Sequence, residues 1–135
     1  MPSITKSDVL PLKNEQDIVL ARQAVRKLTQ ELGFSLVEQT KMVTAASEIA
    51  RNTLIYGGGG TVTWEMLADG LKKGLRLRFE DKGPGIPDVG LALTDGWTSG
   101  TGMGMGLTGA KRLVNEFDLD TRPGEGTRVT LTRWK

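Results

Sequence analysis

The chain has 135 residues, of which 38% are hydrophobic and 25% charged, and its formal net charge is +2. This length and composition predict one folded domain, residues 1–135, and exclude an intrinsically disordered chain. The densest basic patch, Lys72, Lys73, Arg76 and Arg78, has no interleaved aromatic residues. It is more typical of a solvated hairpin than of a nucleic-acid site, so we expect no nucleic-acid partner.

Neither cysteine nor histidine occurs in the sequence. The absence of cysteine excludes disulfides, thiolate nucleophiles and cysteine-based zinc sites. The absence of histidine excludes a Ser-His-Asp triad, an imidazole base and phosphohistidine chemistry. Any proton abstraction must therefore be performed by a carboxylate or, less readily, by a lysine. No apolar run approaches the roughly 18 residues of a membrane span, and the N-terminus has no signal-peptide pattern, so we expect a cytoplasmic protein without a membrane partner.

The N-terminal segment predicts a short strand followed by a helix. Residues 9–12 form an apolar run that contains a proline, which is typical of an edge strand. Asn14 is a suitable helix N-cap, and apolar residues then recur at helical spacing as far as Leu32, just before Gly33. This pattern indicates an amphipathic helix whose apolar stripe packs into the core.

A second helix carries a polar pair. Ser35-x-x-Glu38 is a capping box that opens this helix, and the apolar pattern continues to about Tyr56. Glu48 and Asn52 are four residues apart, so they project from one face of the helix, at the border of its apolar stripe. The pair is a candidate site, although its spacing alone fits surface decoration equally well.

An antiparallel hairpin comes next and ends at a carboxylate. Residues 61–68 and 75–80 alternate apolar and polar side chains, and Asp69 with Gly70 begins the connection between them. The second strand runs directly into Asp81, so this carboxylate is expected at a strand end.

The first of two glycine clusters begins at this carboxylate. Asp81-x-Gly83-x-Gly85 places it beside two residues without a Cβ. A flat ring could therefore lie against the backbone while its amino group donates a hydrogen bond to the carboxylate. Either glycine cluster alone is equally compatible with a simple turn.

The second cluster is Gly102-x-Gly104-x-Gly106-Leu107, which precedes a helical pattern. Unhindered N–H groups at a helix N-terminus suit phosphate oxygens. Residues 104–109 also fit the G-x-G-x-x-G fingerprint, but residues 95–100 and not a buried strand precede them. Residues 127–130, about 20 positions later, contain no acid, so the context of a dinucleotide site is missing. A Walker loop is excluded, because no Gly-Lys-Ser/Thr occurs.

The remaining segments complete the predicted fold. Residues 88–101 are polar, contain glycines and show weak periodicity, as expected of a mobile lid. Residues 107–117 predict a helix with Phe117 facing inward, and residues 117–121 and 127–134 predict a final hairpin. We expect a two-layer α+β sandwich, in which helices cover one side of a mixed, mostly antiparallel sheet.

Three motifs occur in one order along the chain: Glu48-x-x-x-Asn52, the turn at Asp81, and the cluster at Gly102. This order resembles the Bergerat-fold ATPase superfamily shared by gyrase, histidine kinases and mismatch-repair proteins. Further segments look like the switch protein kinase of the bacterial stressosome, and the resemblance covers essentially the whole chain. These segments are residues 50–52, 56–60, 109–113, 116–118, 126–127 and 134–135.

The resemblance implies a role for the polar residues. Asn52 would hold Mg²⁺ through its side-chain carbonyl, and Glu48 would be the general base. Asp81 would bind the adenine amino group of ATP, with Gly85 allowing close approach of the ring and Thr127 supporting it. The chemistry agrees, because phosphoryl transfer needs positioning, a metal and an oriented nucleophile more than covalent chemistry from the protein.

The resemblance also implies roles for the glycines. Gly83 belongs to the adenine turn. Gly102, Gly104 and Gly106, followed by Leu107, would give the lid its hinge and present N–H groups to the phosphates.

In such a family the protein is an ATP-dependent serine/threonine kinase in stress signalling. The implied substrate is a STAS-domain antagonist or stressosome scaffold protein. The implied second partner is a metal-dependent phosphatase of the PP2C type, which the kinase activates by direct binding once it is released from the scaffold.

Other readings remain open. The first is an anti-sigma factor that binds a sigma factor in an ATP-dependent way and phosphorylates its antagonist. That family usually has Asn-Ala followed shortly by a histidine, whereas Asn52 here leads into residues 53–56 and four glycines, which favours the switch kinase. The ATP domain of a histidine kinase would need a histidine-bearing helix that the chain lacks. The last alternative is a structural module without nucleotide chemistry. A direct measurement of nucleotide binding would distinguish it from the kinase.

Overall fold

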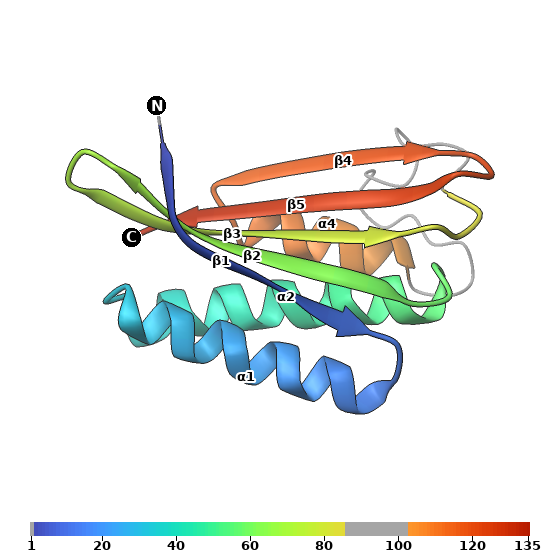
Figure 1. Cartoon of the computed structure of the whole chain (residues 1–135), viewed down its shortest axis with the longest axis horizontal. Coiled ribbons are helices and arrows are strands. Elements are labelled where there is room, and N and C mark those ends of the chain that lie inside the picture. The colour runs from blue at the N-terminus through green and yellow to red at the C-terminus, as the bar shows by residue number, and fades with distance from the viewer. Residues whose placement is uncertain (1, 86–102) are drawn as a thin grey trace.

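The structure of the chain is a computed structural model that describes residues 2–85 and 103–135. Those residues form five strands and three helices (Figure 1). In chain order they are β1 (Ser3–Leu12), α1 (Glu15–Glu31), α2 (Leu36–Ile55), β2 (Gly60–Asp69), β3 (Lys72–Asp81), α4 (Met103–Arg112), β4 (Glu116–Arg122) and β5 (Gly126–Trp134). The expected lid at residues 88–101 and Gly102 lie outside the described residues.

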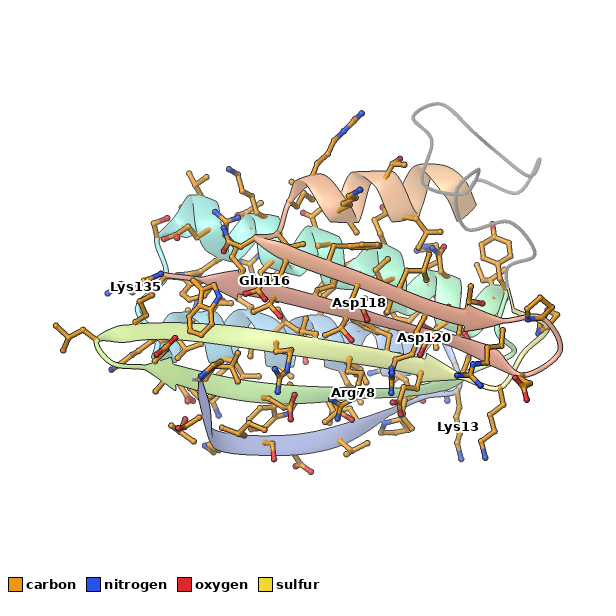
Figure 2. The ribbon with its side chains drawn as sticks, turned by 90° about the horizontal axis from the view of Figure 1, so that it is seen from above. Lys13, Arg78, Glu116, Asp118, Asp120 and Lys135 are labelled. Carbon is orange, nitrogen blue, oxygen red and sulfur yellow. The ribbon has the colours of Figure 1, made fainter. Side chains whose placement is uncertain are left out.

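The strands form one sheet in the order β1-β2-β3-β5-β4. Every pairing among the described strands is antiparallel. Figure 1 shows α1, α2 and α4 on one side of this sheet, which confirms the two-layer α+β architecture. The other face carries no helix in the described part of the chain, and Figure 2 shows the charged side chains of Arg78, Asp118 and Asp120 on its strands. An antiparallel sheet tolerates such a face when its side chains are polar.

The core lies between the sheet and α2. Alternation along the hairpin places Val62 opposite Phe79, and Leu77 opposite Leu131 of β5. These side chains are at most 4% exposed and belong to one buried cluster with Ile49 of α2. Burial of a large apolar side chain contributes about 1.5–3 kcal/mol, so this layer positions α2 firmly against the sheet.

Both long helices begin at the predicted caps. Asn14 Oδ1 accepts a hydrogen bond from the Asp17 backbone N–H at 2.9 Å. At the start of α2, Ser35 Oγ accepts from the Glu38 backbone N–H at 3.2 Å, and Glu38 Oε1 accepts from the Ser35 backbone N–H at 3.0 Å. This hydrogen bond from the Ser35 backbone holds the pKa of Glu38 below its ordinary value. The capping box is therefore confirmed, and it sets the register of the polar pair further along α2.

The structure corrects the helix predicted at residues 107–117. The helix there is α4, which begins earlier, at Met103, and ends at Arg112. Phe117 lies in β4 instead, where it pairs with Leu131. The apolar residues of this segment fit both helical and alternating spacing, and the strand prevails because residues 116–122 pair along the free edge of β5.

The N-terminal strand is longer than the apolar run at residues 9–12 predicted. β1 begins at Ser3 and pairs with β2 along its whole length, with an irregularity between Ile4 and Lys6. Apart from Ile4, residues 3–8 are polar, and all six are exposed, so they give no apolar alternation to detect. Within the described ranges, none of the helices is long and apolar enough to cross a membrane.

Candidate functional site

A cavity of about 350 Å³ lies between α2, the ends of β3 and β5, and Leu107 of α4. Its volume is within the usual range of small-molecule sites, about 300–1,000 Å³. The cavity brings together five predicted site residues from four separate segments: Asn52, Asp81, Gly85, Leu107 and Thr127. Apolar side chains of the core, such as Ile49, Phe79 and Val129, form the rest of its wall.

Asp81 stands at the end of β3, as the sequence predicts. Its Oδ1 accepts hydrogen bonds from the backbone N–H of Gly83 at 2.9 Å and of Thr127 at 3.3 Å. None of the described residues donates a hydrogen bond to its Oδ2. One oxygen is thus used to hold the carboxylate in place, and the other is available to a ligand with a hydrogen-bond donor.

Two glycines that the sequence analysis did not assign to the site pack directly on Asp81. A Cβ on Gly57 would overlap the Asp81 carboxylate, and a Cβ on Gly126 would overlap its backbone carbonyl oxygen. Gly126 also has a φ of +118°, which side chains rarely adopt. Two features of the sequence could have pointed to these residues: the run of four glycines after α2, and the glycine immediately before Thr127. Neither feature indicates which strand end Gly57 or Gly126 packs against.

Thr127 is held from two sides. Its backbone N–H donates to Asp81, and its hydroxyl is 2.8 Å from the hydroxyl of Thr121 on the neighbouring strand. This hydroxyl pair orients the Thr127 side chain beside the Asp81 carboxylate. The placement agrees with the supporting role expected for this residue.

Glu48 and Asn52 meet the second glycine cluster at the other end of the site. A Cβ on Gly106 would lie 3.3 Å from both Asn52 Nδ2 and Glu48 Oε2. Gly106 and Leu107 are buried in α4, which packs against α2. Gly104 lies in the first turn of the same helix. The sequence analysis placed this cluster before the helix, whereas the structure places Gly104 and Gly106 within it.

Asn52 has an unusual environment for an amide. Its Nδ2 is buried and has no hydrogen-bond partner among the described residues. A buried polar group without a partner is costly, which points to a ligand at this position. Because rotation of the amide exchanges its oxygen and nitrogen, the same position could present a carbonyl oxygen. Glu48, one turn earlier, is exposed to solvent.

These residues fit Mg²⁺ only together with a ligand that supplies further oxygens. Among the described residues no group of three or more Asp, Glu, His or Cys side chains could hold a metal ion alone. Mg²⁺ usually takes one or two protein oxygens and completes its shell with phosphates and water. A single amide beside a carboxylate matches that pattern, so the site suits a metal-bound nucleotide and not a metal by itself.

The sequence matches known proteins over most of its length. Residues 37–135 match the family described as histidine kinase-, DNA gyrase B-, and HSP90-like ATPase. The chain is 46% identical over 123 residues to the serine/threonine-protein kinase RsbT of Bacillus subtilis, an alignment that covers 91% of this chain and 92% of that protein. It is 30% identical over 129 residues to an anti-sigma F factor of Clostridium novyi, covering 90% and 89% of the two chains.

Solved structures share the fold. A structure of the RsbU and RsbW domains of a Mycobacterium tuberculosis protein matches with a TM-score of 0.67 at 21% identity, over 97% of this chain and 33% of that chain. A chain of the SiaB–SiaC complex of Pseudomonas aeruginosa matches with a TM-score of 0.57 at 14% identity, over 98% and 91% of the two chains.

Proposed function

Because the chain belongs to the family of histidine kinase-, DNA gyrase B- and HSP90-like ATPases, we propose that it is an ATP-dependent protein serine/threonine kinase acting as a partner switch in bacterial stress signalling. One observation supports this most strongly. A single cavity is lined by the Asp81 carboxylate, which has a free oxygen, and by the unpaired Asn52 amide. Glu48 does not line this cavity, but its carboxylate lies one helical turn before Asn52 and, like Asn52, beside Gly106.

Adenine would occupy the Asp81 end. The free Oδ2 accepts a hydrogen bond from the exocyclic amino group, which is the donor that distinguishes adenine from guanine at that position. Gly57, Gly83 and Gly126 keep the surrounding backbone close to the carboxylate. The core residues that line the cavity offer an apolar surface to the ring.

The phosphates would occupy the Asn52 end, where α4 begins. Asn52 is the residue that would hold Mg²⁺, and Gly106 places no Cβ within 3.3 Å of its amide. When bound, Mg²⁺-ATP supplies the phosphoryl group and a metal that offsets its negative charge. The helix N-terminus adds backbone N–H groups that suit phosphate oxygens.

Glu48 would be the general base. It lies one helical turn from Asn52 and is exposed, so a hydroxyl of a protein substrate can reach it. Glu48 would take the proton of a serine or threonine hydroxyl as the hydroxyl oxygen bonds to the terminal phosphorus of ATP. The bond from that phosphorus to the bridging oxygen would break, with ADP as the leaving group. In a chain without histidine, a carboxylate in this position is the side chain best suited to that task.

The protein substrate proposed is a STAS-domain antagonist or stressosome scaffold protein, and the second partner is a PP2C-type phosphatase activated by binding. The 46% identity to the kinase RsbT supports this assignment. The 30% identity to an anti-sigma F factor supports a second candidate, in which the chain binds a sigma factor in an ATP-dependent way. Capture of purified sigma factors by the immobilised protein, measured with and without ATP, distinguishes the two candidates. ATP-dependent capture would favour the anti-sigma factor.

The test of the kinase is transfer of phosphate to a defined residue. The protein is incubated with ATP, Mg²⁺ and purified STAS-domain proteins, and the phosphosite is mapped by mass spectrometry. We expect one serine or threonine to be modified, and the modification to be strongly reduced with the Asp81→Asn variant at an ATP concentration that does not saturate it. A protein that binds ATP but labels none of these substrates would contradict the assignment.

A further inference from the structure

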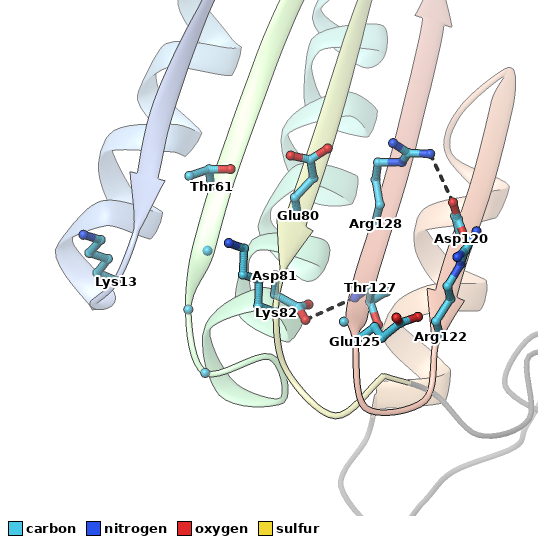
Figure 3. A pocket seen from close by; sticks show the side chains of 14 residues that line it. Lys13, Thr61, Glu80, Asp81, Lys82, Asp120, Arg122, Glu125, Thr127 and Arg128 are labelled. Carbon is cyan, nitrogen blue, oxygen red and sulfur yellow. Dashed lines mark hydrogen bonds and ion pairs between the residues drawn. The ribbon is translucent and has the colours of Figure 1, made fainter.

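A second cavity, of about 820 Å³, lies at the same end of the sheet as the candidate nucleotide site but on the face without helices (Figure 3). Thr61, Glu80 and Arg128 line it. Each is the immediate neighbour of a buried core residue on its strand, so alternation directs its side chain to the opposite face. This cavity is therefore separate from the nucleotide site, although Asp81 and Thr127 line both.

The cavity crosses the sheet from one edge to the other. Its lining residues come from the chain after β1 and from the ends of β2, β3, β5 and β4. Neighbouring strands are about 4.8 Å apart, so the five strands span roughly 19 Å. An extended peptide advances about 3.3 Å per residue, so this groove matches the length of about six residues.

The side chains around the groove carry an excess of unpaired positive charge. Four of them are basic and four acidic. Arg128 is paired with Asp120 at 3.1 Å, and Glu80 lies 3.5 Å from Arg78 outside the groove. The Asp81 carboxylate accepts two backbone hydrogen bonds.

Lys13, Lys82 and Arg122 remain, together with the acidic residues Asp81 and Glu125. Within the described ranges none of these five side chains forms an ion pair, which leaves three positive charges against two negative. Figure 3 shows the three cations spread along the groove, with Lys13 beyond β1, Lys82 near its middle and Arg122 at the β4 side. Spaced charges of one sign suit an extended partner with several negative charges better than a single compact ion.

From this geometry we propose that the groove is a docking site for an extended acidic segment of a partner protein. Acidic side chains of that segment pair with Lys13, Lys82 and Arg122, and its backbone crosses the ends of the strands. Among the described residues, none that lines the groove has an aromatic side chain on which a nucleobase could stack, which disfavours a second nucleotide. This site is distinct from the phosphate end of the nucleotide cavity, so docking here leaves Glu48 free.

The test is a binding titration without any nucleotide, so its outcome is independent of kinase activity. A fluorescent hexapeptide of alternating glutamate and glycine is titrated with the protein, beside a glutamine–glycine peptide of the same length. We expect the acidic peptide to bind at least tenfold more tightly. Replacing any one of the three cations by glutamine should weaken binding about two- to fivefold, and the triple variant should weaken it by more than tenfold.

A matched control removes the same charge elsewhere. The triple variant Lys27→Gln, Lys41→Gln, Lys111→Gln changes exposed lysines on the helical side and should bind the acidic peptide within about twofold of the parent. Glu125→Gln should tighten binding about two- to fivefold, because it removes an opposing charge. Equal loss in the two triple variants, equal binding of the neutral peptide, or displacement by tripolyphosphate at a lower concentration than by unlabelled peptide would each overturn the proposal.

Discussion

At the scale of single residues, Asp81 is the group whose role can be separated most cleanly from folding. Asp81→Asn keeps the size of the side chain and an oxygen that can still accept from Gly83. It removes the charge and offers a donor where the adenine amino group needs an acceptor. Loss of a charge-assisted hydrogen bond costs about 1.5–3 kcal/mol, so ATP affinity should fall roughly ten- to hundredfold.

Calorimetric titration measures this affinity, and an unchanged urea midpoint would show that the variant still folds. Binding within twofold of the parent would mean that Asp81 does not contact the base.

Asn52 is expected to act on ATP through the metal. Asn52→Ala should therefore reduce ATP affinity when Mg²⁺ is present and change it little when Mg²⁺ is removed by a chelator. The comparison of four titrations, with parent and variant each measured with and without Mg²⁺, checks this. A loss of the same size in both conditions would remove Asn52 from the metal site and leave it only a packing role.

Glu48→Gln tests the chemical step alone. The substitution keeps the size and helix propensity of the side chain but removes its ability to take a proton. ATP should bind with near-normal affinity, because Asn52 and Asp81 are intact. Phosphate transfer should slow by about 10²- to 10⁴-fold, the usual contribution of a general base.

Single-turnover transfer to the STAS-domain substrate measures that rate. If the variant transfers phosphate within a few-fold of the parent rate, the base is another group.

At the scale of secondary structure, the capping box of α2 predicts a pH dependence. The Ser35 backbone N–H lowers the pKa of Glu38 in the folded chain. Its charge therefore stabilises the fold above the ordinary glutamate pKa of about 4.3, and that contribution is lost as pH falls through the folded-state pKa. Glu38→Gln retains the hydrogen-bonding geometry but removes the charge. Because Glu38 is largely solvated, the difference should be only a few tenths of a kcal/mol.

Urea unfolding at pH 7 and at pH 3 measures this contribution. We expect the parent to be more stable than Glu38→Gln at pH 7 and equal to it at pH 3. A difference for Glu38→Gln that stays constant with pH would show that the charge is not involved.

The elements that the sequence predicts well are those set by local chemistry. Asn14 and Ser35 cap helices through bonds to residues three positions away, and the hairpin at Asp69 and Gly70 needs only its own turn and alternation. The helix end predicted at Phe117 was wrong because the apolar spacing of this segment is compatible with both a helix and a strand. Only pairing with β5, a non-local contact, decides between them.

At the scale of the whole molecule, part of the site could be predicted and part could not. Asp81 and Asn52 are recognisable because they stand in ordered motifs. The contact of Asp81 with Thr127 joins residues 46 positions apart, and it depends on a strand order that the sequence does not reveal. The close approach of Gly57 to Asp81 likewise depends on how α2 ends against β3. Neither the periodicity nor the composition of the sequence predicts this contact.

Nucleotide binding should also stabilise the entire fold. A ligand at about 100 times its dissociation constant adds about 2.7 kcal/mol, which corresponds to a rise in Tm of about 10 °C for a domain of this size. Gly57→Ala should abolish this rise, because the added Cβ overlaps the Asp81 carboxylate.

Gly109→Ala is the control, since a Cβ there meets no atom within 4 Å. It should keep the ATP-dependent rise. Thermal unfolding with and without Mg²⁺-ATP makes the comparison, and a normal rise in Gly57→Ala would contradict the assignment of Asp81 to the adenine site.

The packing of Gly57 and Gly126 on Asp81 has a consequence for how such sequences diverge. Neither glycine can acquire a side chain while the carboxylate keeps its place, so the three positions form one evolutionary unit. Descendants that still use Asp81 should retain both glycines even where the rest of their loops has drifted. A lineage that loses the carboxylate is released from both constraints at once, and substitutions at 57 and 126 should then follow. Such a pattern would mark the point in a family tree where nucleotide binding ended and only the scaffold was inherited.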